Sequence, residues 1–277
     1  MQWKGRRASA NVEDRRGMGG KTVIGGGIGS IVIVLLVVLL GGNPGDLLNG
    51  ITGSDTGTPY EETAQDKELA QFVSVVLADT EDVWTDIFRK EGLTYEKPVL
   101  VLYSGSVDSA CGSASSAVGP FYCPGDHKLY IDLSFYDELQ NRFHAAGDFA
   151  MAYVIAHEVG HHVQTLLGSG EDSRPGRNAT KAQTNAFSVR YELQADYFAG
   201  VWAKQEQGKQ LLDKGDVDEA LTAASAVGDD AIQKAAQGYV VPESFTHGTS
   251  EQRKRWFTKG LATGTVEGGD TFHAGNL

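Results

Sequence analysis

The chain has 277 residues, of which 41% are hydrophobic and 22% charged, so it is long enough to fold around a substantial core. Its net charge is −12, although the first 21 residues are basic, so the remainder is strongly acidic. An acidic body excludes nucleic acid as a partner, because binding it requires a basic face.

An uncharged, largely aliphatic stretch covers residues 22–40, TVIGGGIGSIVIVLLVVLL. It is long enough to cross the hydrocarbon core of a bilayer. The basic residues before it predict that the N-terminus (1–21) stays in the cytoplasm and that the rest of the chain lies outside. A cleaved signal peptide is the alternative, but the apolar run is long and no A-x-A site follows it. We therefore expect a single-pass protein of the cell membrane, anchored through residues 22–40.

The region after the anchor contains two features of an extracytoplasmic protein. Residues 41–60 are rich in Gly, Pro, Ser and Thr, which predicts a flexible linker. Cys111 and Cys123 are the two cysteines of the chain. Outside the cytoplasm, such a closely spaced pair favours a disulfide. Metal binding is the alternative, but no second cysteine pair completes a four-cysteine site.

We expect one α+β domain over residues 61–277. Apolar residues recur at helical spacing from 61 to about 90. Two buried strands are predicted at 98–103 and 128–132, and a short helix follows the second. Further helices are predicted over 148–167, about 179–207, 216–237 (as one helix or a pair), and from about 250 onward. Because the strands precede most of the helices, the order of elements favours the α+β class.

The segment HEVGHH, residues 157–162, contains the pattern H-E-x-x-H. Four residues of separation place His157 and His161 on one helix face, where two imidazoles can bind zinc. Glu158 lies close to such a metal without being needed as a ligand, and its carboxylate can accept a proton from a water. The alternative to a zinc site is a helix whose histidines are ordinary core or surface residues.

A second helix, with the sequence RYELQADYFAG, supplies two acids on one face, Glu192 and Asp196. A catalytic zinc site needs three protein ligands and one open position, so Glu192 is the candidate third ligand. Asp196 can accept the remaining N–H of a ligand histidine and thereby fix its orientation. The alternative is a solvated acidic pair, but the aromatic and aliphatic residues around both acids disfavour it.

These motifs resemble those of the bacterial membrane-anchored neutral zinc metallopeptidases, within the gluzincin branch of the zincin fold. The resemblance rests on DFAMAYVIAHEVGHHVQ and YELQADYFAGVWA, and extends to WKGRRASANVEDRRG, GPFYCPGDHKLYIDLSFYDEL and THGTSEQRKRWF. It implies a zincin-like domain, one zinc ion per chain, and cleavage of peptides or unfolded proteins. It also implies that residues 128–132 form the edge strand beside the metal-binding helix.

The expected mechanism uses Glu158 as the general base toward a zinc-activated water. His247 is the first candidate for a donor to the oxyanion, and Tyr239 is the second. Two alternatives remain open at this point. In the first alternative to an enzyme, the chain is a catalytically idle zinc-binding module. In the second, it is a membrane-tethered assembly or chaperone-like factor.

Overall fold

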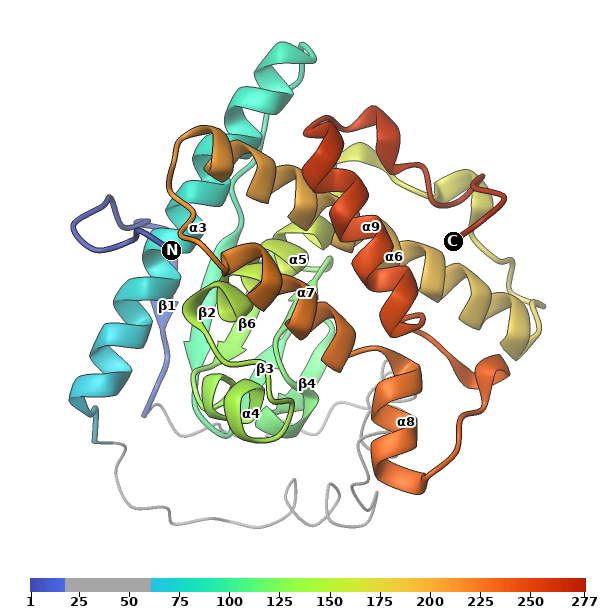
Figure 1. The fold of residues 1–277 in the computed structure, drawn as a ribbon, viewed down its shortest axis with the longest axis horizontal. Helices are drawn as coiled ribbons and strands as arrows, with labels where there is room; N and C mark the ends of the chain where they lie inside the picture. Colours follow the sequence, from blue (N-terminus) through green and yellow to red (C-terminus); the bar gives the residue numbers. More distant parts are fainter. Residues whose placement is uncertain (18–60) are drawn as a thin grey trace.

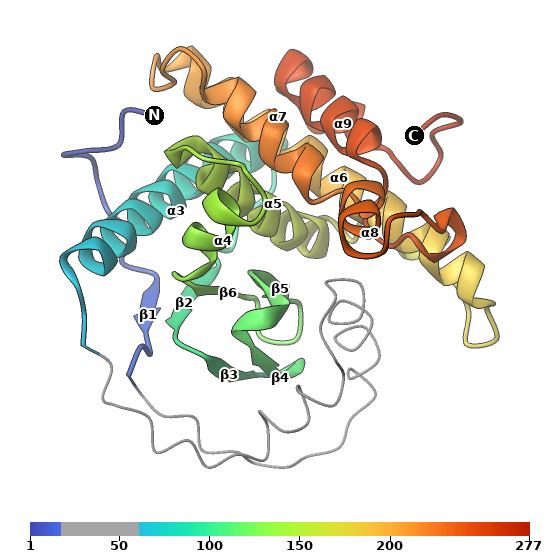
Figure 2. The same cartoon turned by 60° about the horizontal axis from the view of Figure 1, so that its bottom comes forward.

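The computed structural model describes residues 1–17 and 61–277, and these form an α+β fold, as expected. A small sheet lies on one side of a layer of helices (Figures 1 and 2). The predicted anchor (22–40) and linker (41–60) fall outside the described residues. Within the two described ranges, no helix is long and apolar enough to cross a bilayer.

The main sheet has four strands in the order β1-β2-β6-β5. The strands β1 (Val12–Asp14), β2 (Val99–Tyr103) and β6 (Lys128–Asp132) run parallel, whereas β5 (Phe121–Cys123) is antiparallel to β6. A separate hairpin consists of β3 (Ser106–Ser109) and β4 (Gly112–Ser115). The expectation that residues 128–132 form the edge strand is wrong, because β5 pairs with the outer side of β6 and becomes the edge.

The N-terminal residues are an integral part of this fold. Val12 pairs with Leu100 in the sheet, and the Leu100 N–H donates to the carbonyl of Asn11 at 2.9 Å. The Trp3 ring is buried and packs edge-on against Phe72, with 5.4 Å between ring centroids. The domain therefore contains residues 1–17 together with 61–277, which corrects the expected division into a separate segment 1–21 and a domain starting at 61.

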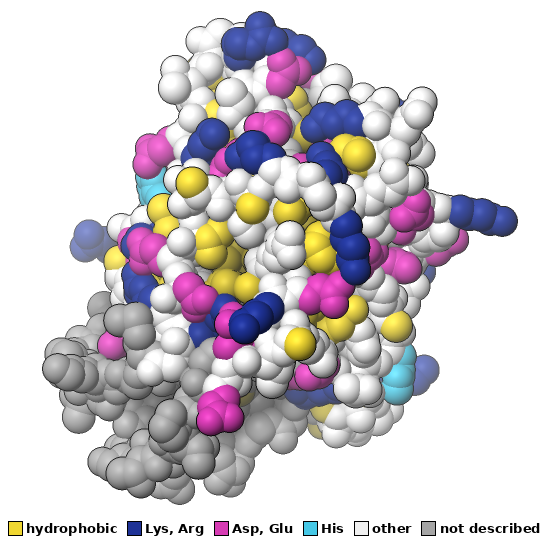
Figure 3. Space-filling model, turned by 90° about the vertical axis from the view of Figure 1, so that its left-hand side faces the viewer, with side chains coloured by type: hydrophobic (Ala, Val, Ile, Leu, Met, Phe, Trp, Pro, Cys, Tyr) yellow, Lys and Arg dark blue, Asp and Glu magenta, His cyan; other side chains and the backbone are white. Residues whose placement is uncertain are grey.

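The basic residues of this N-terminal arm have partners inside the domain. Lys4 pairs with Glu68 and Arg7 with Asp82, each at 2.7 Å, and Arg6 pairs with Asp79 at 2.5 Å. Figure 3 shows the result, a face on which charges of both signs are interspersed. Lys4, Arg6 and Arg7 thus form ion pairs with one helix, residues Ala64–Lys90.

Most helices occupy the predicted ranges. They are α3 (Ala64–Lys90), α4 (Phe135–Asn141), α5 (Asp148–Leu167), α6 (Lys181–Gly208), α7 (Asp216–Ala226), α8 (Asp229–Gln237) and α9 (Ser250–Thr263). The predicted element at 216–237 is therefore a pair. The helices α3, α6 and α9 each begin with a capping box, at Thr63, Thr180 and Thr249 respectively. In each box the threonine hydroxyl accepts the backbone N–H three residues later.

Glycines set the close approach of the three helices that build the site. A Cβ on Gly160 of α5 would lie 2.9 Å from the carbonyl oxygen of Ala195, so only glycine lets α6 come this near. Gly200 of α6 faces Gly260 of α9 in the same manner, each against the backbone of the other helix. These contacts bring residues from α5, α6 and α9 into one buried cluster.

Candidate metal centre

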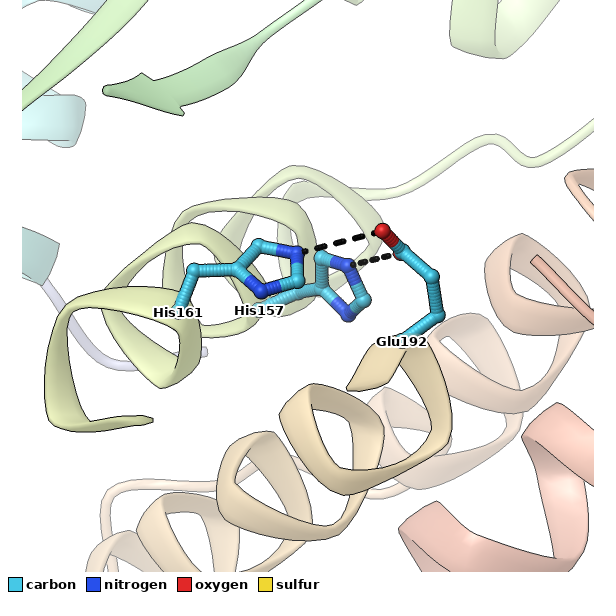
Figure 4. Close-up of side chains that lie close together, drawn as sticks. All are labelled: His157, His161 and Glu192. Atoms are coloured by element: carbon cyan, nitrogen blue, oxygen red, sulfur yellow. Dashed lines mark hydrogen bonds and ion pairs between the residues drawn. The ribbon is translucent and has the colours of Figure 1, made fainter. Parts of the chain in front are cut away.

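Three predicted ligands converge between α5 and α6. His157 and His161 lie one turn apart on α5, and Glu192 faces them from α6 (Figure 4). The Glu192 carboxylate lies 3.2 Å from His157 Nε2 and 3.6 Å from His161 Nε2. One ligand atom from each residue lies within 4.8 Å of the others, which is the arrangement that a single metal ion requires. The structure therefore brings together the three residues that the sequence nominated.

Hydrogen bonds to Nδ1 orient the rings of both histidines. His157 Nδ1 donates to Asp196 Oδ1 at 2.8 Å, as expected from the sequence. His161 Nδ1 donates to Gln164 Oε1 at 2.7 Å, because the Gln164 amide nitrogen is already used as a donor to the Tyr191 carbonyl. In both rings Nδ1 is thereby occupied, and Nε2, the nitrogen available to a metal, is directed toward Glu192.

Asp196 is the centre of a buried network that the sequence did not reveal. Arg253 of α9 contacts both carboxylate oxygens, Nε to Oδ2 at 2.8 Å and Nη2 to Oδ1 at 3.0 Å. The Tyr153 hydroxyl donates to Oδ1 at 2.5 Å. Both Arg253 and Tyr153 are buried. The available signal was the arginine-rich start of α9, but nothing in the sequence shows which of its arginines points inward.

The electrostatics of the metal-free chain favour a cation between the ligands. Burial opposes a charge on His157, yet Asp196 and Glu192 raise its pKa to about 9. Burial likewise opposes ionisation of Glu192, but His161, His247 and His157 hold the pKa of this carboxyl well below its usual range. A proton on the imidazole thus occupies the place where a metal ion would supply the positive charge.

Glu158 follows the first ligand and is 8% exposed. Burial raises the pKa of its carboxyl, and the neighbouring His161 and His157 offset this effect only in part. A carboxylate that binds protons more readily than usual suits a general base.

His247 lies beside this cluster, whereas Tyr239 does not. The Glu192 carboxylate and Asp229 raise the pKa of His247 against the effect of burial. His247 Nδ1 donates to Asp229 Oδ1 at 3.2 Å, and Asp229 Oδ2 accepts the backbone N–H of His247 at 2.7 Å. Asp229 was not identified from the sequence, although its place at the start of α8 is a typical position for an acid that binds backbone N–H groups. Tyr239 is 62% exposed on the loop after α8.

A second acidic group in the described residues differs from the first in its chemistry. It consists of Asp148, Asp216 and Glu219, all carboxylates. The amino group of Met1 lies among them, 2.7 Å from Asp148 and 3.3 Å from Asp216. Only the group at His157 offers the two imidazoles and one carboxylate that suit zinc.

The predicted disulfide is present. Cys111 and Cys123 are bonded, with 5.8 Å between their Cα atoms. Cys123 belongs to β5, so the bridge ties the edge strand to the turn of the β3–β4 hairpin.

Comparison with known proteins agrees with this site. Residues 1–272 match the model of a family described as "putative neutral zinc metallopeptidase". The chain belongs to this family. It is 48% identical to the uncharacterized protein YpfJ of Escherichia coli K12, over 98% of this chain and 99% of that one. It is also 48% identical to the uncharacterized protein Rv2575 of Mycobacterium tuberculosis H37Rv, over 66% of this chain and 65% of that one. No solved structure matches.

Because the family match begins at residue 1, it includes the N-terminal arm as well as the metal-binding helices. The family description names zinc, and the nitrogen, nitrogen, oxygen donor set of His157, His161 and Glu192 fits that ion.

Proposed function

We propose that the protein is a zinc-dependent peptidase that hydrolyses peptide bonds with Glu158 as general base. The observation that carries this proposal is the convergence of His157 Nε2, His161 Nε2 and the Glu192 carboxylate beside Glu158. Three protein ligands leave a fourth position open for water or substrate, which distinguishes catalytic from structural zinc sites. Zn²⁺ held there would polarise the attacking water and the scissile carbonyl.

Proton transfer and stabilisation of the oxyanion are assigned to side chains of the protein. Glu158 accepts the proton of the attacking water and returns it to the leaving amine, and its raised pKa favours the first of these transfers. His247, held by Asp229, is the proposed donor to the negative charge that develops on the carbonyl oxygen. With Nδ1 donating to Asp229, the Nε2 atom remains available to face the substrate. The exposure of Tyr239 removes the support for it as the second candidate.

The edge strand offers a place for an extended substrate. β5 pairs with β6 on one side, and its other side has no partner strand among the described residues. It also packs against α5, which carries the two histidine ligands. A peptide or unfolded protein that adds to this free edge as a further strand would pass the metal centre in extended form.

We propose a cellular arrangement that differs from the one expected from the sequence. The pairing of β1 with β2 supports a shared compartment for residues 1–17 and the metal centre. We still propose attachment to the membrane through residues 22–40, but with residues 1–17 on the same side of the membrane as the metal centre.

The test compares the parent protein with Glu158→Gln, which keeps the volume of the side chain and removes its basicity. Both are loaded with zinc, and their cleavage of unfolded casein is measured with and without a chelator. We expect equal zinc contents, cleavage by the parent that the chelator abolishes, and no cleavage by the variant. Equal cleavage by the two proteins would refute the role of Glu158. Zinc binding without cleavage by either would favour the idle zinc-binding module or the assembly factor.

A further inference from the structure

His162 has no part in the chemistry proposed above, although it directly follows the ligand His161. Its side chain is fully buried. One residue along a helix corresponds to a rotation of about 100°, so His162 points away from the metal ligands. It contacts the strand side of α5 instead, through Tyr122 of β5.

Both ring nitrogens of His162 have defined partners. Nε2 lies 2.6 Å from the carbonyl oxygen of Glu96, which can only accept, so this nitrogen carries the proton. Nδ1 therefore accepts, and the Tyr122 hydroxyl donates to it at 3.1 Å. The imidazole thus joins the segment before β2 to the edge strand β5, with the metal-binding helix as its base.

Three aromatic rings surround this imidazole edge-on. Tyr95, Tyr122 and His127 have their centroids 5.6, 5.5 and 5.7 Å from that of His162. They come from the segment before β2, from β5 and from the turn between β5 and β6. Because the rings exclude water, the two hydrogen bonds are more costly to lose than exposed ones.

The strand β5 is short and lies at the edge of the sheet. It has three residues, and its pairing with β6 is confined to them. Phe121 and Cys123 pack into the small cluster with Val107 and Ala114, whereas Tyr122 packs against the main core. Tyr122 is therefore the β5 side chain directed toward α5, as the alternation of a strand requires.

We propose that His162 is a positioning residue, which through Tyr122 fixes the edge strand β5, and with it a bound peptide, over the metal centre. This inference rests on the proposed function, because it assumes that an extended substrate adds to β5. Main-chain hydrogen bonds to an added strand supply affinity, so a loosened β5 should weaken substrate binding.

The test removes one hydroxyl. Tyr122→Phe keeps the ring and leaves His162 Nδ1 without its donor. Tyr197→Phe is the matched control, since the Tyr197 hydroxyl is also held in the interior, at 2.7 Å from Thr263 Oγ1 and 2.8 Å from the Thr265 carbonyl, but on the α9 side. For fluorescein-labelled unfolded casein, we expect Tyr122→Phe to raise KM up to about tenfold at unchanged kcat and zinc content. Tyr197→Phe should leave KM unchanged at a similar loss of thermal stability.

A second measurement does not depend on activity. Amide hydrogen exchange should accelerate at residues 121–123 in Tyr122→Phe, while the amides around His157 and His161 stay as protected as in the parent. His162→Phe should also accelerate exchange at residues 121–123, and the double variant should add little there, because both changes break the hydrogen bond between Tyr122 and His162. Unchanged exchange in β5, or an equal rise of KM in Tyr197→Phe, would overturn the inference. If the parent does not cleave casein at all, the proposed function fails, whereas the exchange result still decides whether His162 holds β5.

Discussion

Replacing Asp196 by asparagine should weaken zinc binding, although Asp196 is not itself a ligand. The carboxylate accepts four hydrogen bonds, from His157 Nδ1, the Tyr153 hydroxyl and two nitrogens of Arg253. Burial opposes its charge, but Arg253 and His157 lower its pKa to about 2. Asparagine has one acceptor oxygen and an amide that would face a donor, so at least one buried donor loses its partner.

The magnitude follows from the two roles of this side chain. Loss of one member of a buried ion pair costs about 3–5 kcal/mol of stability, because the Arg253 guanidinium remains in the interior. Loss of the group that orients a ligand histidine costs about 10–100-fold in metal affinity. We therefore expect both a lower free energy of unfolding and a zinc dissociation constant raised by at least about tenfold.

A control separates these two effects. Glu206 is a fully buried carboxylate of the same helix and pairs with Lys209 at 2.9 Å. It lies fourteen residues beyond Glu192, about 20 Å along the helix. Glu206→Gln should lower stability without changing zinc affinity. Competition titration with a zinc chelator and urea unfolding of the metal-free proteins measure the two quantities. If Asp196→Asn binds zinc within twofold of Glu206→Gln, the reasoning about His157 is refuted.

Three further predictions concern helix packing, pH and topology. Gly160→Ala places a Cβ 2.9 Å from the Ala195 carbonyl, so it should lower the free energy of unfolding by about 1–3 kcal/mol and weaken zinc binding measured by calorimetry. Burial lowers the pKa of His162 to about 4, so as pH falls from 6.5 to 4 only the unfolded chain gains this proton and stability declines. Urea unfolding should show that the free energy of unfolding of the parent falls by about 3 kcal/mol between pH 6.5 and 4, and that this fall is absent in His162→Phe. An equal dependence of this free energy on pH in the two proteins would contradict the prediction. Cysteines introduced at the exposed Ala10 and Ala182 should react alike with a membrane-impermeant maleimide on intact cells, and labelling of one alone would contradict the shared compartment.

Local patterns in the sequence predicted the helices and the ligands. The predicted helix over residues 148–167 agrees with α5 to the residue. The spacing of His157 and His161 carries its own geometry, since helix periodicity alone puts both imidazoles on one face.

Features that depend on long-range contacts could not be obtained in this way. The strand β1 has three residues and no alternating pattern, and only its pairing with β2 makes it a strand. The partners of the N-terminal basic residues, such as Asp79 on α3 for Arg6, could not be predicted because they are far away in sequence. Arg253 was missed for the same reason, since its partner Asp196 lies on another helix.

The identity of the metal and of its ligands is the central claim, and anomalous diffraction from zinc-loaded crystals tests it most directly. The account predicts one peak at the zinc edge per chain, about 2.0–2.2 Å from His157 Nε2, His161 Nε2 and a Glu192 oxygen. A peak at Asp148, Asp216 and Glu219 instead, or no peak between α5 and α6 after loading, would contradict it.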